Sequence, residues 1–506
     1  METEIELKFF VSPEYSEILK RKISEAKVLQ HSCRELQNTY FDTHDYWLRQ
    51  HDTGLRIRRF DDVYVQTVKT SGRVVAGLHQ RPEYNAEHDS NTPLLSLHPD
   101  DIWPEGRTAE QIQSELKPLF STDFTREQWL LGMSEGSQIE VAFDQGKVIA
   151  GDKDEPICEV ELELKSGQTG ALFSLARTIT EDGGARLGTL SKAARGYRLV
   201  YGHKADEVKS ISLVDTHYSD SVESCFIQSL EYALSHWTYH EQVYAEQHSI
   251  VALHEINHAI CLIRQVLAVY SDVVPKRATA VIRQELKWLE QELDWLKLSD
   301  YLDNLLEDKG HALRKLDARK FLVAELKLLH QKLPSVDDML KLFHSARYTA
   351  LILDLNRWIL SRGWQPFLDE KSSDVLAGAI KPFSAEKLEQ TWQELKVVFP
   401  ADKALSCEDY QAQQYCLMRN LYTGISFASL YDEEERQSFR LPWADLLQGI
   451  DDLLMLKPLE ELVDKLEGES KEQLQRWLSR QQSSILHAME QTRSIGMEAS
   501  PYWRSH

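Results

Sequence analysis

Glu4-Ile-Glu-Leu-Lys8 alternates ionisable and apolar residues at every position. Alternate side chains of an extended strand point to opposite faces, so this stretch predicts a strand with one apolar face and one wholly charged face. The same alternation recurs at residues 55–58, 63–69, 139–144 and 157–165. If these strands share a sheet, carboxylates and cations gather on one of its faces. The chain up to about residue 205 is therefore expected to be mainly β.

From about residue 217 the apolar residues recur instead at intervals of three and four, as in Leu286, Leu289 and Leu293. This period is typical of helices that bury one face. The sequence predicts an α+β protein with two domains. A β domain at residues 1–202 and an all-helical domain at 217–506 are joined by a linker at 203–216.

The bulk composition is that of a globular protein. The chain has 506 residues, of which 42% are hydrophobic, and this length exceeds what one compact core organises. A formal net charge of -22 argues against nucleic-acid partners and against binding to an anionic membrane. The most apolar helical stretch, residues 251–270, is interrupted by His254, Glu255 and His258. Six scattered cysteines and an acidic start of the chain lead us to expect a cytoplasmic protein with free thiols.

The charged strand faces allow two interpretations. They could simply face solvent, or they could line the inside of a barrel or tunnel. Carboxylate clusters bind hard divalent cations such as Mg²⁺ or Mn²⁺, and groups of Arg and Lys bind phosphate oxygens. A metal-bound polyphosphate needs both kinds of group on one surface. The repetition of the pattern in five segments favours the barrel or tunnel.

A series of ordered motifs resembles the CYTH family, the triphosphate tunnel metalloenzymes, over about residues 1–202. The motifs are Glu4-x-Glu6-x-Lys8, Tyr40-Phe-Asp42, Leu55-Arg-Ile-Arg58, Thr67-Val-Lys69, Arg81-Pro-Glu83, Phe124-Thr-Arg126, Val141-Ala-Phe-Asp144, Glu159-Val-Glu161-Leu-Glu163 and Ser191-Lys192-Ala-Ala-Arg195. The resemblance implies an eight-stranded antiparallel β-barrel that forms a tunnel. The five-residue start alone is a weak signal, whereas the ordered series is specific.

The resemblance also implies roles for individual residues. The triphosphate would be bound by Lys8, Arg56, Arg58, Lys69, Arg81, Arg126 and Lys192. Metal would be bound by Glu4, Glu6, Asp144, Glu159 and Glu161, with Glu163 included because two overlapping Glu pairs of residues 157–165 fit the motif. Glu4, Glu6, Lys8 and Lys192 would be catalytic. Two ions, Mg²⁺ or Mn²⁺, are expected, one on the phosphates and one that positions water for in-line attack.

The helical half resembles a CHAD domain, which implies two four-helix bundles and binding of polyphosphate. The motif of the first CHAD repeat, His-x-x-Arg-x-x-x-Arg-Arg-x-Arg, reads here His254, Asn257, Cys261, Leu262 and Arg264. Three of the four arginines are replaced, while a later helix retains His344 and Arg347. Polyphosphate binding by this domain therefore stays open.

His254-Glu255-Ile-Asn-His258 also matches the zinc motif H-E-x-x-H, which places two imidazoles on one face of a helix. No third ligand follows at the spacing that a metalloprotease uses. We therefore disfavour a zinc site.

The leading hypothesis is hydrolysis of inorganic triphosphate to pyrophosphate and phosphate, because a CYTH domain followed by a CHAD domain resembles bacterial inorganic triphosphatases. Thiamine triphosphatase and adenylyl cyclase are alternatives that would use the same tunnel. A polyphosphate-binding scaffold is the non-enzymatic alternative.

Overall fold

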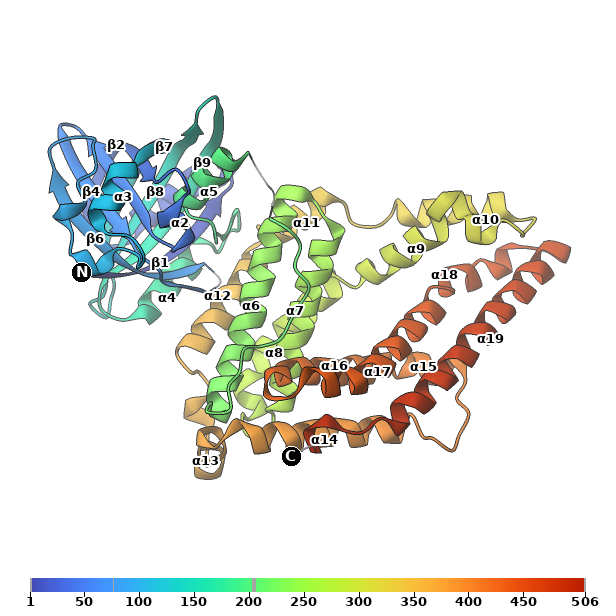
Figure 1. Cartoon of the computed structure of the whole chain (residues 1–506). Coiled ribbons are helices and arrows are strands. Elements are labelled where there is room, and N and C mark those ends of the chain that lie inside the picture. Colours follow the sequence, from blue (N-terminus) through green and yellow to red (C-terminus); the bar gives the residue numbers. More distant parts are fainter. Residues whose placement is uncertain (1, 76, 203–205, 505–506) are drawn as a thin grey trace. The chain divides into compact units, whose positions relative to one another are not determined.

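The computed structural model of the chain describes residues 2–75, 77–202 and 206–504. Residues 203–205 of the predicted linker lie outside the described residues. The chain forms two compact units (Figure 1). The barrel unit comprises Met1–Glu207, Thr238–His248 and Leu340–Ser361, and the remaining residues form the helical unit. The domain borders expected from the sequence stay a prediction.

One antiparallel sheet makes up the core of the barrel unit. Its strands are β1 (Glu2–Val11), β2 (Val28–Asp42), β3 (Gly54–Phe60), β4 (Val63–Lys69), β5 (Arg73–Val75), β6 (Leu78–His88), β7 (Lys117–Gly132), β8 (Gln138–Ala150), β9 (Lys153–Ser166) and β10 (Ala185–Leu187). The order is β10-β1-β9-β8-β7-β2-β3-β4-β6-β5, and an additional pairing of β1 with β6 closes eight strands into a barrel. The predicted eight-stranded antiparallel barrel is confirmed.

Strand β1 closes the barrel because, besides the short β10, it pairs with two barrel strands along its length. Its residues 2–7 pair with β6, and its residues 6–10 pair with β9. Closure gives β1 a hydrogen-bonded neighbour on each of its two edges. It also fixes the register, which sets Lys8 opposite Glu161 and Glu6 opposite Glu163.

The barrel reverses the usual arrangement of polar and apolar residues. The apolar residues of the alternating strands, such as Leu7 and Leu162, point outward and are fully buried there. Helix α4 (Thr169–Ile179) covers β1 and β9 on this outer side, and helix α1 (Ser16–Glu25) packs on α4. A second outer cluster joins Leu55 and Ile57 of β3 to Ile112. The hydrophobic effect therefore stabilises the barrel from outside and leaves the interior to charges.

Two further short helices, α2 (Trp47–Gln50) and α3 (Ala109–Glu115), lie in the loops of the barrel. Helix α5 (Lys192–Tyr201) contacts β7, β8 and β9 and fills one end of the interior. Its Tyr197 and Leu199 pack with Phe120 and Phe124 in an apolar cluster. The helix approaches so closely that a Cβ atom at Gly196 would lie 2.0 Å from the ring of Phe120.

The barrel unit also includes segments from two later helices, α6 (Val222–Gln247) and α12 (Ala346–Leu360). Helix α12 packs on α4, and its Thr349 Oγ1 donates to the carbonyl oxygen of Ala185 in β10 at 2.8 Å. Asn356 Nδ2 donates to the carbonyl oxygen of Val75 in β5 at 2.9 Å. Residues far beyond 202 thus complete the hydrogen bonding of the two short strands.

The helical unit confirms the prediction of an all-α second half. Its elements include α7 (Ile250–Val269), α8 (Lys276–Glu292), α9 (Trp295–Gly310), α10 (Arg319–His330), α11 (Val336–Phe343), α13 (Glu370–Ala377), α14 (Ile380–Val398), α15 (Cys407–Ala412), α16 (Gln414–Ser426), α17 (Glu433–Leu454), α18 (Lys457–Glu460) and α19 (Gly468–Glu498). Helix α7 is long and apolar enough to cross a membrane by length and composition, and 67% of its most apolar window is buried inside the protein. The grouping into two four-helix bundles stays a prediction.

Replacing Gly196 with Ala is expected to destabilise the barrel unit by about 1–3 kcal/mol, because the added methyl group must displace the ring of Phe120. Equilibrium urea unfolding of the full chain measures the change. Gly170→Ala in α4 is the matched control, since a Cβ there meets no atom within 4 Å. It should be neutral or up to about 1 kcal/mol more stable, as helix propensity predicts. Equal midpoints for the two variants would contradict the close contact.

Candidate functional site

The interior of the barrel holds a cavity of about 230 Å³ beside the end filled by α5. Its walls carry these predicted residues: Glu4, Glu6, Lys8, Arg56, Arg58, Lys69, Arg81, Arg126, Glu161, Glu163 and Lys192. Asp144 and Glu159 do not line the cavity, and both are fully buried. Seven strands and one helix thus bring the predicted residues together.

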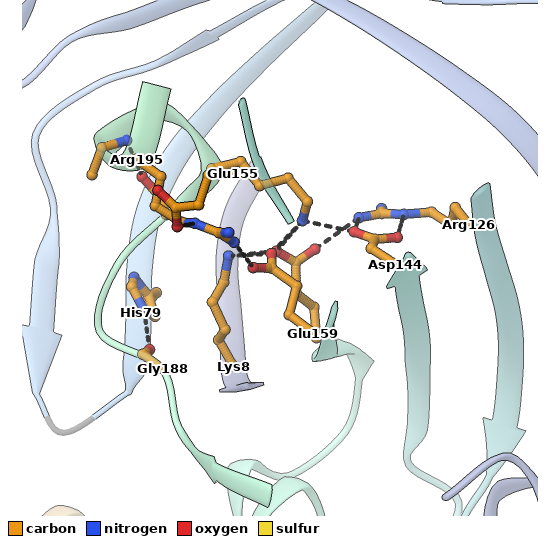
Figure 2. A network of polar contacts seen from close by, with 12 residues as sticks. Lys8, His79, Arg126, Asp144, Glu155, Glu159, Gly188 and Arg195 are labelled. Atoms are coloured by element: carbon orange, nitrogen blue, oxygen red, sulfur yellow. Dashed lines mark hydrogen bonds and ion pairs between the residues drawn. The ribbon is translucent and has the colours of Figure 1, made fainter. Parts of the chain in front are cut away.

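Glu159 lies at the centre of a buried network of charges (Figure 2). Its Oε1 atom lies 3.0 Å from Lys8 Nζ and 2.5 Å from Lys192 Nζ. Its Oε2 atom lies 3.2 Å from Arg195 Nη1. Three cations therefore surround one carboxylate, and the side chains of Lys8 and Lys192 are fixed as a result.

Glu161 and Asp144 extend this network toward β7. Glu161 Oε1 lies 2.7 Å from Lys8 Nζ and 3.0 Å from Lys192 Nζ. Arg126 donates from Nε and Nη2 to both oxygens of Asp144, at 2.7 and 2.6 Å, and reaches Glu161 at 2.8 Å. Burial alone would raise the pKa of Glu161, but the three cations hold it well below its usual range. These carboxylates are ionised.

The carboxylates at the other end of β1 have too little compensating charge. Glu4 Oε2 lies 2.5 Å from Lys69 Nζ, which also pairs with Glu83 at 3.0 Å. Burial raises the pKa of Glu4 to about 7, with Glu6 and Glu83 adding to the effect against Lys69. Burial and the charge of Glu161 also raise the pKa of Glu6. Negative charge is therefore in local excess at Glu4 and Glu6.

Three arginines have too few anions on the wall formed by β3, β4 and β6, which adjoins β1 and sets Arg81 beside Glu4. Among the described residues, no carboxylate lies within ion-pair distance of Arg56, Arg58 or Arg81. The buried Nε atoms of Arg56 and Arg81 have no hydrogen-bond acceptor, while Arg58 Nε donates to Asn38 Oδ1 at 2.9 Å. Burial and the charges of Arg56 and Arg126 lower the pKa of Arg58 to about 9. This wall can accept an anion with several oxygens.

The carboxylates fit hard divalent cations in two places. Oxygen atoms of Asp144, Glu159 and Glu161 all lie within 4.8 Å of one another, although lysines and arginines already pair with them. Nearer the centre of β1, strand pairing sets Glu6 opposite Glu163, and Glu163 opposite Glu140. Oxygen ligands of this kind suit Mg²⁺ or Mn²⁺. The excess negative charge at Glu4 and Glu6 makes the second place the better match.

The structure places all three glutamates of the ambiguous β9 motif on one face. Glu161 and Glu163 line the cavity, whereas Glu159 lies beneath it with three cationic partners. The pair Glu161 and Glu163 is therefore the accessible one. Sequence alternation alone could not distinguish the pairs, because it gives every second residue the same face.

Sequence reasoning missed Glu140, Arg195 and His79 as parts of the site. Glu140 lines the cavity. It lies four residues before Asp144 on the same strand, so strand alternation already places both side chains on one face. Arg195 donates to Glu155 at 2.5 Å as well as contacting Glu159. Burial, with the nearby charge of Lys8, lowers the pKa of His79 to about 4, so its ring is neutral. Arg195 belongs to the motif of residues 191–195, but no pattern in the sequence indicates its partners Glu155 and Glu159 or the neutral ring of His79.

The zinc motif of α7 forms no comparable centre. His254 Nε2 contacts Asp300 Oδ1 at 3.0 Å, and His258 Nδ1 contacts Glu255 Oε1 at 3.6 Å. None of the three-ligand groups formed by the described residues includes either histidine. The two imidazoles of this helix thus contact separate carboxylates.

Residues 2–197 match the family model of the CYTH domain, and residues 228–454 match that of the CHAD domain. The chain carries a CYTH domain followed by a CHAD domain. An inorganic triphosphatase from Haemophilus influenzae is 43% identical over 201 residues, which cover 39% of this chain and 54% of that protein. The match thus spans about half the length of this curated relative.

Two solved structures resemble the separate domains. The CHAD domain of the plant Ricinus communis is 18% identical, with a TM-score of 0.43, and covers 58% of this chain and 97% of its own. A proposed adenylyl cyclase from Hippeastrum with a dominant triphosphatase activity is 19% identical, with a TM-score of 0.29. It covers 38% of this chain and 95% of its own. Similarities this low carry no information about chemistry.

Arg195→Met is expected to destabilise the protein by about 3 kcal/mol, because it removes one partner from a fully buried carboxylate. Arg177→Met is the control, since Arg177 is 44% exposed and its ion pair with Asp354 spans 3.5 Å. The control should cost less than about 1 kcal/mol. Urea unfolding of the full chain measures both, and equal losses would show that Glu159 does not depend on Arg195.

Proposed function

We propose that the chain hydrolyses inorganic triphosphate to pyrophosphate and phosphate in the cavity of its CYTH domain. The observation that carries the proposal is the division of the cavity into a cation-rich and a carboxylate-rich wall. A metal-bound triphosphate satisfies both walls at once. The inorganic triphosphatase of Haemophilus influenzae, 43% identical over the matching region, supports the same substrate.

The arginine wall would bind the substrate. Arg56, Arg58 and Arg81 have no carboxylate partner in the described part of the chain, so phosphate oxygens would supply acceptors for them. Lys8 and Lys192 would act as fixed cations, because the carboxylates around them raise their pKa against the effect of burial. Their role is to stabilise charge on the leaving group and not to transfer protons.

The carboxylate wall would hold the divalent ions at Glu4, Glu6, Glu161 and Glu163, and we propose Mg²⁺ or Mn²⁺ as these ions. When bound, they supply neutralisation of phosphate charge and a lowered pKa for water. Glu4 and Glu6 would contact the ions from β1. Asp144 and Glu159, which lie beneath the cavity, form ion pairs that hold the lysines and Arg126 in place. Lys69 links the two walls through its ion pair with Glu4.

The filled end of the barrel favours a short substrate. Tyr197 and Leu199 of α5 close the interior with apolar side chains. A linear triphosphate can enter from the other end, whereas a long polyphosphate cannot thread through. Thiamine triphosphate and ATP would need room for an organic group at the open end, and these substrates stay alternatives.

The helical unit does not favour the polyphosphate scaffold. Arg264, the one arginine left in the CHAD motif, pairs with Glu290. A cavity beside His254 is lined by more acidic than basic residues, namely by Asp300, Asp303, Asp451 and Asp452 against Lys297 and Arg440. Polyphosphate would be repelled there. The six free cysteines suit the reducing cytoplasm, where we place the enzyme.

Glu4→Gln and Glu6→Gln are each expected to lower the rate of triphosphate hydrolysis by about 100-fold, because each removes charge that holds the metal. Their thermal midpoints should not fall, since both groups carry unfavourable burial. Glu35→Gln, on an exposed position of β2, is the control and should retain full activity. Full rates in both cavity variants would refute the assignment.

A substrate and metal panel tests the reaction itself. Phosphate release from triphosphate should require Mg²⁺ or Mn²⁺, stop with chelator and resume when metal is restored. Thiamine triphosphate, ATP and long polyphosphate should be hydrolysed more slowly, because α5 fills one end of the cavity. Hydrolysis of triphosphate that chelator does not affect would exclude the metal mechanism, and formation of cyclic AMP from ATP would indicate a cyclase.

A further inference from the structure

A second, much smaller cavity lies inside the helical unit, between α14, α16, α17 and the C-terminal turn Tyr502–Arg504. Its volume is about 20 Å³. Aromatic and aliphatic side chains form most of its wall, among them Phe439 and Trp503. The polar side chains of Thr391 and Asn420 and the two arginines Arg436 and Arg440 also line it. Two cations therefore share a mainly apolar wall.

Arg436 and Arg440 lie four residues apart on α17, so they occupy one face of the helix. Arg436 is only 5% exposed. The buried Nε atoms of both arginines lack an acceptor, as does Nε1 of Trp443 in the same wall. Burial and the neighbouring charge of Arg436 lower the pKa of Arg440. Three donors around one cavity thus lack a partner.

The described residues supply no direct ion-pair partner, although Arg440 also borders the aspartate-lined cavity beside His254. None of their carboxylates lies within ion-pair distance of either guanidinium. Glu389, close in the chain to the cavity wall, instead accepts from Trp503 Nε1 at 2.9 Å and from Arg504 at 2.6 Å. Asp432 accepts from the backbone at the start of α17. A guanidinium keeps its proton in proteins, so burial without an anion is strongly unfavourable.

The size of the cavity selects the anion. About 20 Å³ gives room for one or two water-sized particles. Phosphate and pyrophosphate, with their tetrahedral groups, are too large. An apolar wall also favours an ion that gives up its hydration easily. We propose that this cavity binds a single halide ion, chloride under ordinary conditions, held by Arg436, Arg440 and Trp443.

The halide site is independent of the proposed triphosphatase activity. It would act as a structural counter-ion that ties α17 to α14, α16 and the C-terminal turn. Like charges at this spacing destabilise a helix, and a shared anion converts the repulsion into a bridge. Chloride should therefore stabilise the helical unit specifically, and not through ionic strength alone.

Two measurements on the full chain test the site. The first is the thermal midpoint in chloride against gluconate at constant ionic strength, and the second is the broadening of the chloride NMR line by the protein. Wild type should gain stability in chloride and broaden the line. Arg436→Met and Arg440→Met should lose both effects. Arg476→Met, which removes an exposed arginine of α19, should retain both.

Arg440→Met also gives a stability result that a purely structural role of Arg440 would not produce. In gluconate it should be more stable than wild type, because one of two repelling charges is gone. In chloride the advantage should disappear. This variant also decides the question if Arg436→Met fails to fold, since Arg440 is only partly buried.

The proposal fails if chloride broadening and stabilisation are the same in wild type and Arg440→Met, or if wild type shows neither. It also fails if sulfate or phosphate stabilises the protein through Arg440 as strongly as chloride does. That result would show that the cavity opens for an oxyanion and that its size does not select the ligand.

Discussion

A fully buried carboxylate, Glu159, sets the condition on which the barrel interior depends. A buried charge persists only when opposite charges and hydrogen bonds compensate for lost hydration. Lys8, Lys192 and Arg195 provide this compensation, and they come from β1 and α5, far apart in the chain. The same ion pairs that stabilise Glu159 therefore hold the two lysines in place at the wall of the cavity. The ion pairs that compensate the buried charge are thus the same contacts that set the geometry of the site.

The charges are not balanced everywhere, and the imbalance is spatially ordered. Beneath the cavity, acids and cations are paired. At the cavity wall, Glu4 and Glu6 have excess negative charge, while Arg56 and Arg81 have buried donors without acceptors. A protein can retain such groups when a ligand completes them. The outward-facing apolar clusters supply the stability that the interior does not, because α4 and the loops around α3 bury the opposite faces of the same strands.

Period-two alternation was enough to predict the β half, because each strand needed only local information: Leu7 and Leu162 on one face, Glu6 and Glu161 on the other. The motif order then led to the eight-stranded barrel. Contacts that join distant segments were beyond this reasoning. Alternation puts Glu140 on the same strand face as Asp144, but its pairing with Glu163 on the neighbouring strand is not a local feature. The filling of one barrel end depends on the contact of Gly196 with Phe120, which no local pattern reveals.

The hydrogen bonds from α12 to the barrel also affect the order in which the barrel unit can fold during synthesis. The carbonyl oxygens of Val75 and Ala185 accept hydrogen bonds from Asn356 and Thr349. These donors follow them in the chain by 281 and 164 residues. During synthesis from the N-terminus, the eight long strands can pair early, but β5 and β10 lack these donors until helix α12 has left the ribosome. The two short strands β5 and β10 thus mature last. Helix α12 must be synthesised before the barrel unit is complete.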